Sequence, residues 1–264
     1  MQRRRRFLAA GAATLATAVA CPAFAARLAN IEIGLILMHG KWGRSPGPLA
    51  PYLEREGYRV RSPDMPWGAR RLYDAPYRTA LEELHLQVGQ LRAAGARKVV
   101  VGGESFGANG ALAYQAHYGD ADALVLLAPG HNPGGWYRSG DTRDDVDRAT
   151  ALAKEGKSTE RITFTDMNQS NPRKMIATVD TYLSYFAPRG RANMNVSARR
   201  IKAPLPVLLV NSADEAPTHG RAYIFDALPP HPRSEYVESP LAHGAAAEGA
   251  RADVQRFLDV LAQA

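Results

Sequence analysis

Ser105 is the residue of this sequence whose surroundings point most directly to covalent chemistry. It stands at the centre of the pentapeptide Gly-Glu-Ser-Phe-Gly at residues 103–107. A short β-branched segment at 98–101 precedes the pentapeptide, and a helix-forming segment at 108–118 follows it. A G-x-S-x-G sequence between a strand and a helix forms a sharp turn that exposes the serine hydroxyl and directs the next backbone N–H toward a developing oxyanion. Ser105 is therefore the candidate nucleophile, and the N–H of Phe106 is a candidate oxyanion donor.

A serine hydroxyl is a weak nucleophile at neutral pH and needs a neighbouring base, which a third group must orient. His243 is the candidate base because it directly follows the strand-like segment 235–237 and precedes the last helical segment. Two other histidines fit less well. His219 lies only five residues beyond the candidate acid with no strand between them, and His231 lies between prolines before the last strand.

Asp214 is the candidate for the orienting acid. It lies just past the apolar segment 206–210, and one β-α-β step separates it from His243. Such a step places two residues at neighbouring strand ends of a parallel sheet. Glu215, the next residue, is the alternative acid.

The sequence His-Gly-Lys-Trp-Gly at residues 39–43 follows the first apolar segment directly. A glycine-bracketed turn at this place can present a second backbone N–H to an oxyanion. We expect that donor to be the amide of Lys41. The His39 side chain is expected to brace the turn through a hydrogen bond rather than to take part in the chemistry.

Several large side chains lie in loops that follow predicted strands. In an open parallel sheet, those loops line the crevice at the carboxyl ends of the strands. These side chains have glycine and proline neighbours rather than periodic apolar ones, which favours a substrate-lining role. The residues are Trp42, Met65, Trp67, Trp136 and Tyr137.

The elements that must position these groups alternate between strand-like and helix-like patterns, which predicts a parallel sheet with helices on its faces. The expected strands are 31–38, 58–61, 98–101, 123–128, 206–210 and 235–237, and the expected helices are 48–56, 79–94, 108–118 and 245–262. Between 131 and about 200 the pattern gives way to a polar, turn-rich stretch with two weak helical segments near 146–153 and 171–185. We interpret this stretch as a cap inserted between two sheet strands.

Taken together, these features resemble the α/β-hydrolase superfamily, in particular its serine esterases and lipases. The resemblance covers essentially all of residues 26–264: His-Gly after an early strand, the nucleophile turn, a cap, and then an acid and a histidine in the order Ser-Asp-His. It implies a doubly wound, mostly parallel sheet with helices on both faces. It also implies a triad of Ser105, His243 and Asp214 that cleaves a carboxylic ester without any cofactor.

Two departures from the superfamily pattern bear on this assignment. Asn211 stands where the family often has glycine before the acid, and the turn at 39–43 lacks the triple-glycine run of one esterase branch. The same triad also supports hydrolysis of thioesters, lactones, amides or carbon–carbon bonds, and acyl transfer, because fold and triad do not select the bond. An exported binding protein on a hydrolase scaffold is the non-enzymatic alternative.

The first 25 residues have the three parts of an export signal. Four arginines at 3–6 precede an Ala/Leu/Val/Thr-rich stretch at 7–20 and the small-x-small sequence Ala-Phe-Ala at 23–25. The order Arg-Arg-x-Phe-Leu at 4–8 resembles the twin-arginine signal of bacteria. We expect cleavage after Ala25 and a periplasmic or secreted enzyme, with a lipoprotein signal around Cys21 as the less favoured alternative.

Composition narrows the remaining possibilities. The chain has 264 residues, of which 45% are hydrophobic and 22% charged, as in soluble globular proteins. Without residues 1–25 it carries 29 basic and 26 acidic residues and no cysteine, since Cys21 is the only one. A disulfide framework, a thiolate metal site and a nucleic-acid partner are therefore not expected. No histidines and carboxylates stand at metal-ligand spacing, so we expect a small-molecule acyl substrate and no metal. The oligomeric state has no signal in the sequence.

Overall fold

The computed structural model describes residues 30–263 except 46, 214 and 216–218. The proposed export signal at 1–25 and the candidate acid Asp214 thus lie outside the described residues. The helices and strands, in chain order, are β1 (Ile33–Met38), α2 (Leu49–Arg55), β2 (Arg59–Arg61), α3 (Tyr77–Ala93), β3 (Lys98–Glu104), α4 (Phe106–Tyr118), β4 (Ala123–Leu127), α5 (Pro133–Ser139), α6 (Arg143–Lys154), β5 (Arg161–Asn168), β6 (Asn171–Thr178), α7 (Val179–Phe186), α8 (Met194–Arg200), β7 (Val207–Ser212), the 3-10 helix η1 (Phe225–Ala227), β8 (Glu235–Ser239), α10 (His243–Gly249) and α11 (Arg251–Ala262).

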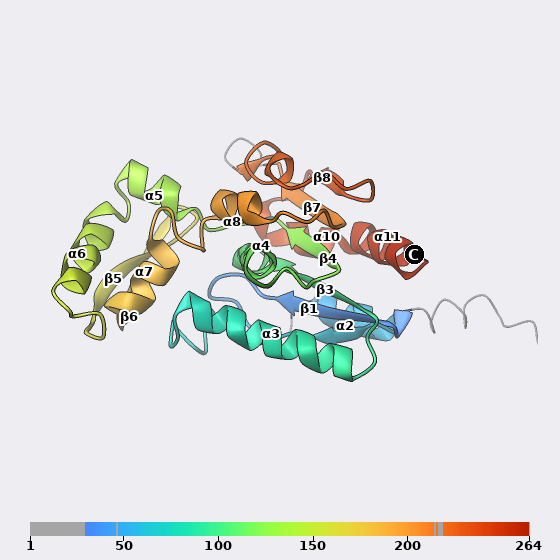
Figure 1. Ribbon diagram of the computed structural model, residues 1–264. Coiled ribbons are helices and arrows are strands. Elements are labelled where there is room, and N and C mark those ends of the chain that lie inside the picture. Colours follow the sequence, from blue (N-terminus) through green and yellow to red (C-terminus); the bar gives the residue numbers. More distant parts are fainter. Residues whose placement is uncertain (1–29, 46, 214, 216–218, 264) are drawn as a thin grey trace, which may run out of the picture.

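The central sheet has six strands in the order β2-β1-β3-β4-β7-β8, and every neighbouring pair is parallel (Figure 1). The register aligns the carboxyl ends of the middle strands: Met38 lies opposite Gly103, and Glu104 lies opposite Leu127. The loops that leave these strands therefore begin at one edge of the sheet. The doubly wound parallel sheet expected from the sequence is confirmed.

Two apolar layers cover the two faces of the sheet. Residues Val99 and Val101 of β3 pack with helices α3 and α4, whereas Val100 faces α2 and α11 on the other side. This alternation follows from the period of two in a β-strand and explains why the middle strands are apolar throughout. Burying one leucine or valine side chain contributes about 1.5–3 kcal/mol, so these layers hold the sheet edge rigidly in place.

The cap interrupts this pattern between β4 and β7. It contains α5, α6, the antiparallel hairpin β5–β6, α7 and α8, and most of it lies at one end of the molecule beyond the sheet (Figure 1). The predicted helix at 171–185 is wrong in its first half, because 171–178 form strand β6. Along β6 the side chains of Met175 and Ala177 are buried between exposed neighbours, which is the alternation of a half-buried strand.

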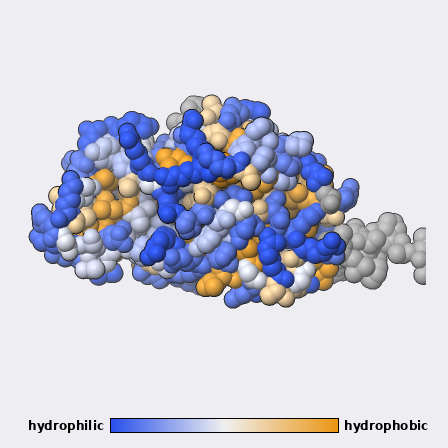
Figure 2. Space-filling model, viewed as in Figure 1, coloured by the Kyte–Doolittle hydropathy of each residue, from blue (hydrophilic) through white to orange (hydrophobic). Residues whose placement is uncertain are grey.

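The last predicted helix is divided in two. Helices α10 and α11 meet at Ala250, and the apolar stripe of α11 packs under the sheet through Val254, Phe257, Leu258 and Leu261. Among the described residues no helix is long and apolar enough to cross a membrane. Hydrophilic side chains cover most of the face seen in Figure 2, and hydrophobic ones appear in small patches between them.

Candidate functional site

Ser105 occupies a strained turn between β3 and α4. Its φ of 52° and ψ of −116° lie in a region that residues with a side chain rarely adopt, at a cost of about 1–3 kcal/mol. Two backbone hydrogen bonds connect this turn to β4 and the loop after it. The Ser105 N–H donates to the Leu127 carbonyl (2.9 Å), and the Ser105 carbonyl accepts from the Gly130 N–H (3.0 Å). The strain is thus balanced by contacts from β4 and the loop after it.

The glycines of the pentapeptide permit a very close approach to β1. A Cβ atom on Gly103 or Gly107 would lie 2.4 or 2.3 Å from the Met38 carbonyl oxygen, which is closer than real atoms approach. Glycine at these two positions lets the strand end, the turn and the start of α4 pack against one another. The motif in the sequence therefore has a steric cause.

Ser105 lines a cavity of about 290 Å³, which we call the Ser105 cavity. Its wall brings together residues from the turns after β1, β3, β4 and β7, from the tip of the β5–β6 hairpin and from the start of α10. The lining residues are Lys41, Ser105, Phe106, Gly130, His131, Asn132, Trp136, Asn168, Gln169, Ser170, Glu215, His219 and His243. Six segments of the sequence thus meet around one hydroxyl group.

His243 is the first residue of α10, directly after the turn that follows β8. Its Nδ1 lies 2.7 Å from Oε2 of Glu215, and both side chains are largely buried. A carboxylate at this distance holds the Nδ1–H tautomer, which leaves Nε2 as the proton acceptor. Among the described residues, the carboxylate that contacts His243 is that of Glu215, the alternative acid expected from the sequence.

Gly130 shows how close the serine and the histidine are. A Cβ atom on this glycine would lie 2.7 Å from Ser105 Oγ and 3.4 Å from His243 Cε1. Both side chains thus border the same small space, which exists because position 130 has no side chain.

The two residues whose backbone amides are the expected oxyanion donors, Phe106 and Lys41, both line the Ser105 cavity. The Phe106 N–H is at the first turn of α4, where a helix leaves its N–H groups unpaired and carries a positive partial charge. The Lys41 N–H has no hydrogen-bond acceptor in the part of the chain that the structure describes. The Gly40 N–H approaches Oε1 of Glu104 at 3.4 Å, so the turn also contacts the end of β3.

His39 braces the turn, as the sequence suggested. Its Nδ1 lies 2.8 Å from the Gly40 carbonyl, and its Nε2 accepts from the Met65 N–H at 3.0 Å. The indole N–H of Trp67 donates to the His39 carbonyl. The ring is buried behind the turn and does not line the Ser105 cavity.

The Lys41 side chain makes contacts that the sequence did not suggest. Its ammonium group lies 2.6 Å from Oδ1 of Asp166 and 2.6 Å from the Met167 carbonyl in β5. Both charged side chains are almost fully buried. Burial lowers the pKa of Lys41, and the charge and hydrogen bond of Asp166 oppose this shift.

The residues expected to line a substrate site fall into four places. Trp136 lines the Ser105 cavity, whereas Trp42 lines a separate groove beside the hairpin. Tyr137 bonds to Asp147 on the cap surface. The expectation for Met65 and Trp67 is wrong: both are fully buried in the core, where Trp67 packs on Phe106 at 4.7 Å between ring centroids. Glycine and proline neighbours signal a loop, but they do not tell whether its side chain points into the core.

The sequence analysis missed several cavity residues. His219, which we had set aside, lies in the same cavity as His243, and burial lowers its pKa. The buried ring of His131 stacks on Phe106 at 4.1 Å between ring centroids, and burial lowers its pKa well below the usual value. The position of His131 in the loop that follows the strand at 123–127 was an available signal. The three hairpin residues 168–170 carried none, because the hairpin itself was not recognised.

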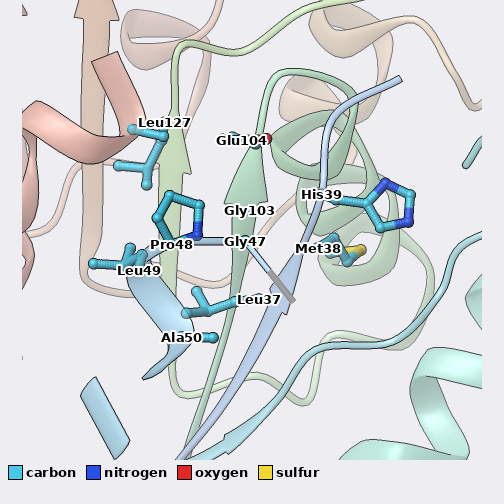
Figure 3. A pocket seen from close by; sticks show the side chains of 11 residues that line it. Leu37, Met38, His39, Gly47, Pro48, Leu49, Ala50, Gly103, Glu104 and Leu127 are labelled. Carbon is cyan, nitrogen blue, oxygen red and sulfur yellow. The ribbon is translucent and has the colours of Figure 1, made fainter. Parts of the chain in front are cut away.

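We also considered a small apolar cavity and groups of potential metal ligands as functional sites. A small cavity, of about 30 Å³, lies between β1, the start of α2 and the ends of β3 and β4. In Figure 3 the aliphatic side chains of Leu37, Leu49 and Leu127 gather around it, whereas the His39 ring points away. This space has room for about one water molecule. Within the described ranges, no three His, Cys, Asp or Glu side chains are grouped so that they could hold a metal ion.

Solved structures of similar fold come from several organisms. The monoacylglycerol lipase of Paleococcus ferrophilus has a TM-score of 0.60 and 19% identity, with 85% of this chain and 93% of that chain covered. A thermostable carboxyl esterase from Bacillus coagulans has a TM-score of 0.59 and 15% identity, with 87% and 88% covered. The alpha/beta hydrolase GrgF from Penicillium sp. sh18 has a TM-score of 0.61 and 17% identity, with 87% and 89% covered. Identities this low establish a common fold only.

The sequence comparison gives the family directly. No curated protein sequence is significantly similar to this chain. A model of the Alpha/beta hydrolase family, in contrast, matches residues 35–260, which run from within β1 to within α11. With the fold, the nucleophile turn and this match in agreement, the chain belongs to the alpha/beta hydrolase family.

Proposed function

We propose that this protein is a serine hydrolase that cleaves carboxylic esters through a covalent acyl-enzyme. The observation that carries the proposal is the His243–Glu215 contact of 2.7 Å in the cavity that also contains the strained Ser105. A nucleophile, a base and an orienting acid are the groups that acyl transfer requires. Two structures of similar fold bear the names of a monoacylglycerol lipase and a carboxyl esterase, which supports an ester as the substrate.

In the proposed mechanism, Ser105 Oγ attacks the ester carbonyl while His243 Nε2 takes up the hydroxyl proton. The carboxylate of Glu215 stabilises the imidazolium that forms. The N–H groups of Phe106 and Lys41 donate to the tetrahedral oxyanion, and loss of one such donor typically costs about 10²–10³ in rate. His243 then protonates the leaving alkoxide. Water hydrolyses the acyl-enzyme in a second round with the same groups.

Glu215 is the acid that we favour in this triad, because its carboxylate contacts the imidazole. Asp214, the acid expected from the sequence, stays a prediction since it lies outside the described residues. The two assignments differ in which of the two carboxylates, when neutralised, costs more activity.

Export to the periplasm or the medium completes the proposal. Its support is the basic, apolar and small-residue order of residues 1–25. Replacing the arginine pair by Arg4→Lys and Arg5→Lys is expected to retain unprocessed protein in the cytoplasm of a host with twin-arginine export. Unchanged recovery of shortened protein outside the cytoplasm would argue against this type of signal.

The nucleophile is tested by active-site labelling. We expect a fluorophosphonate probe to label Ser105 and expect Ser105→Ala to lose the label together with about 10⁴-fold or more of p-nitrophenyl acetate hydrolysis. Ser139→Ala, which removes an exposed hydroxyl of the cap, is the matched control and should keep both. Full labelling of folded Ser105→Ala protein would refute the proposal.

A further inference from the structure

The tip of the β5–β6 hairpin forms part of the wall of the Ser105 cavity. Residues Asn168, Gln169 and Ser170 line it, and Gln169 has a left-handed φ of 54° in the tight turn between the two strands. A two-residue turn of this kind keeps its backbone direction fixed relative to the strands. The place of the tip over the serine therefore depends on where the strands are anchored.

The anchor nearest to the tip is the ion pair between Lys41 and Asp166. Asp166 lies in β5 two residues before Asn168, and the next carbonyl, that of Met167, accepts from the same ammonium group. Lys41 lies in the turn whose amide we place at the oxyanion. One side chain thus joins the turn after β1 to the strand that carries the hairpin tip, across 125 residues of sequence.

The Lys41–Asp166 ion pair is almost fully buried, and both carboxylate oxygens of Asp166 accept hydrogen bonds. The second oxygen of Asp166 accepts from the Trp42 indole N–H (2.7 Å) and the Tyr73 hydroxyl (2.8 Å). The Lys41 ammonium also lies over three aromatic rings at 5.0–5.4 Å from their centroids, those of Phe106, Trp136 and Phe186. A buried ion pair adds little net stability compared with an apolar pair of the same shape, but it defines one geometry.

The chemistry of the cavity wall indicates which substrates the hairpin would admit. Beside the rings of Phe106 and Trp136, the wall of the Ser105 cavity contains side-chain amides and a hydroxyl, from Asn132, Asn168, Gln169 and Ser170. A long alkyl chain would remove these groups from water without replacing their hydrogen bonds, which is costly. A short or hydroxylated acyl group would not carry this cost, because it leaves these groups in contact with water or forms hydrogen bonds with them.

We propose that the Lys41–Asp166 pair positions the hairpin tip over Ser105 and so makes the enzyme select esters of short, polar acyl groups. The inference rests on the proposed function, because it concerns the substrate of the same serine. Lys41 and Asp166 act here as positioning residues through their side chains. The hairpin tip is the specificity-determining element.

The test compares acyl preference between the wild-type protein and Asp166→Asn. The wild type is expected to show a higher kcat/KM for p-nitrophenyl acetate than for the octanoate, and a higher one for the 3-hydroxybutyrate than for the butyrate. In Asp166→Asn the acetate value should fall about tenfold, since small displacements at a reacting centre are costly. The octanoate value should fall less, so that the acetate-to-octanoate ratio drops at least about fivefold.

Two further variants separate positioning from stability. Lys41→Met with Asp166→Asn removes both charges, so thermal stability should recover relative to Asp166→Asn alone while the ratio stays low. A ratio that recovers together with stability would mean that the pair has a structural role only. Asn168→Ala changes the tip without touching the pair, and it should also lower the ratio even if Asp166→Asn does not fold.

Lys174→Met is the matched control on the same hairpin, because its ammonium group is exposed and lies 3.3 Å from the Thr165 hydroxyl. It should leave acyl preference unchanged. An unchanged ratio in both Asp166→Asn and Asn168→Ala, or a wild type that prefers octanoate, would overturn the inference. Labelling of Ser105 in the same proteins would then still support the proposed function, so that the two failures can be told apart.

Discussion

The turn that carries Ser105 and the hairpin tip at 168–170 border the same cavity, but different forces hold them in place. The turn is fixed by apolar packing on both faces of the sheet and by backbone contacts so close that only glycine fits at Gly103 and Gly107. The hairpin is joined to the turn after β1 by a charged hydrogen-bond network around Asp166. Apolar packing tolerates little change in volume, whereas a polar network depends on direction and charge.

This difference means that changes in the two regions should have different consequences. Steric changes at the nucleophile turn should affect folding. Changes at the polar junction should affect specificity and pH dependence while the sheet survives. Changes to the reacting groups themselves should leave both intact and remove activity.

After Ser105→Ala, the largest effect on activity is expected for Glu215→Gln. A neutral amide cannot hold the Nδ1–H tautomer of His243 as a carboxylate does, so kcat should fall by about three to four powers of ten. Asp214→Asn is the matched control one residue away, and it should cost less than about tenfold. Steady-state kinetics with p-nitrophenyl acetate, together with circular dichroism of both variants, provide the measurement. A reversed order of the two losses would make Asp214 the acid.

A large effect on stability is expected for Gly107→Ala. The new Cβ would lie 2.3 Å from a backbone oxygen that cannot move away easily, and we expect a loss of about 3 kcal/mol in the free energy of unfolding. Gly89→Ala provides the opposite case, since Gly89 lies on the exposed side of α3 with nothing within 4 Å of the added atom. That variant should gain about 0.5–1 kcal/mol. The free energy of unfolding of both variants would be measured by urea denaturation. A Gly107→Ala variant as stable as the wild type would contradict the steric argument.

A smaller effect is expected for Tyr73→Phe, which removes one hydrogen bond to the buried Asp166 carboxylate. A hydrogen bond to a charged group contributes about 1.5–3 kcal/mol, so the variant should lose about 2 kcal/mol while the labelling of Ser105 persists. Thermal unfolding and fluorophosphonate labelling would be measured on the same sample. A loss of labelling without a loss of stability would show that the network and the nucleophile turn are not separate.

The smallest effect concerns pH and His131. Burial, followed by the nearby Lys41 charge, lowers the pKa of His131 in the folded state far below its value of 6.5 in a free chain. Its stabilising contribution is therefore complete above pH 6.5 and is lost as the pH falls, because only the unfolded chain takes up the proton. Between pH 7.5 and 5.5 the wild type should lose about 1.4 kcal/mol from this group.

His131→Gln should remove that part of the pH dependence, whatever its effect on stability at pH 7.5. His85→Gln is the control, since His85 is an exposed histidine of α3. The measurement is urea unfolding of the three proteins at both pH values. The same pH dependence in wild type and His131→Gln would show that the His131 ring takes up a proton in the folded state.

Much of the sheet could be predicted because its signals are local. Strands such as β4 are short, apolar and bounded by turn residues, and the pentapeptide at 103–107 marks one strand end unambiguously. The cap was harder. Strand β6 begins Asn-Pro-Arg-Lys, which shows no alternation of apolar residues until Met175, so the hairpin could not be recognised from its pattern alone.

The sequence by itself determined which residues could take part in chemistry, their order along the chain and the parallel sheet that positions them. The periodicity of apolar residues and the placement of glycines carry this information, because both act over only a few residues. Only the tertiary structure decided that Glu215 contacts His243, that Trp67 and Met65 belong to the core, and that the Lys41 side chain reaches Asp166. The physical reason is that these outcomes depend on burial and on charge partners supplied by segments far apart in the chain. Such partners meet only when the chain is folded.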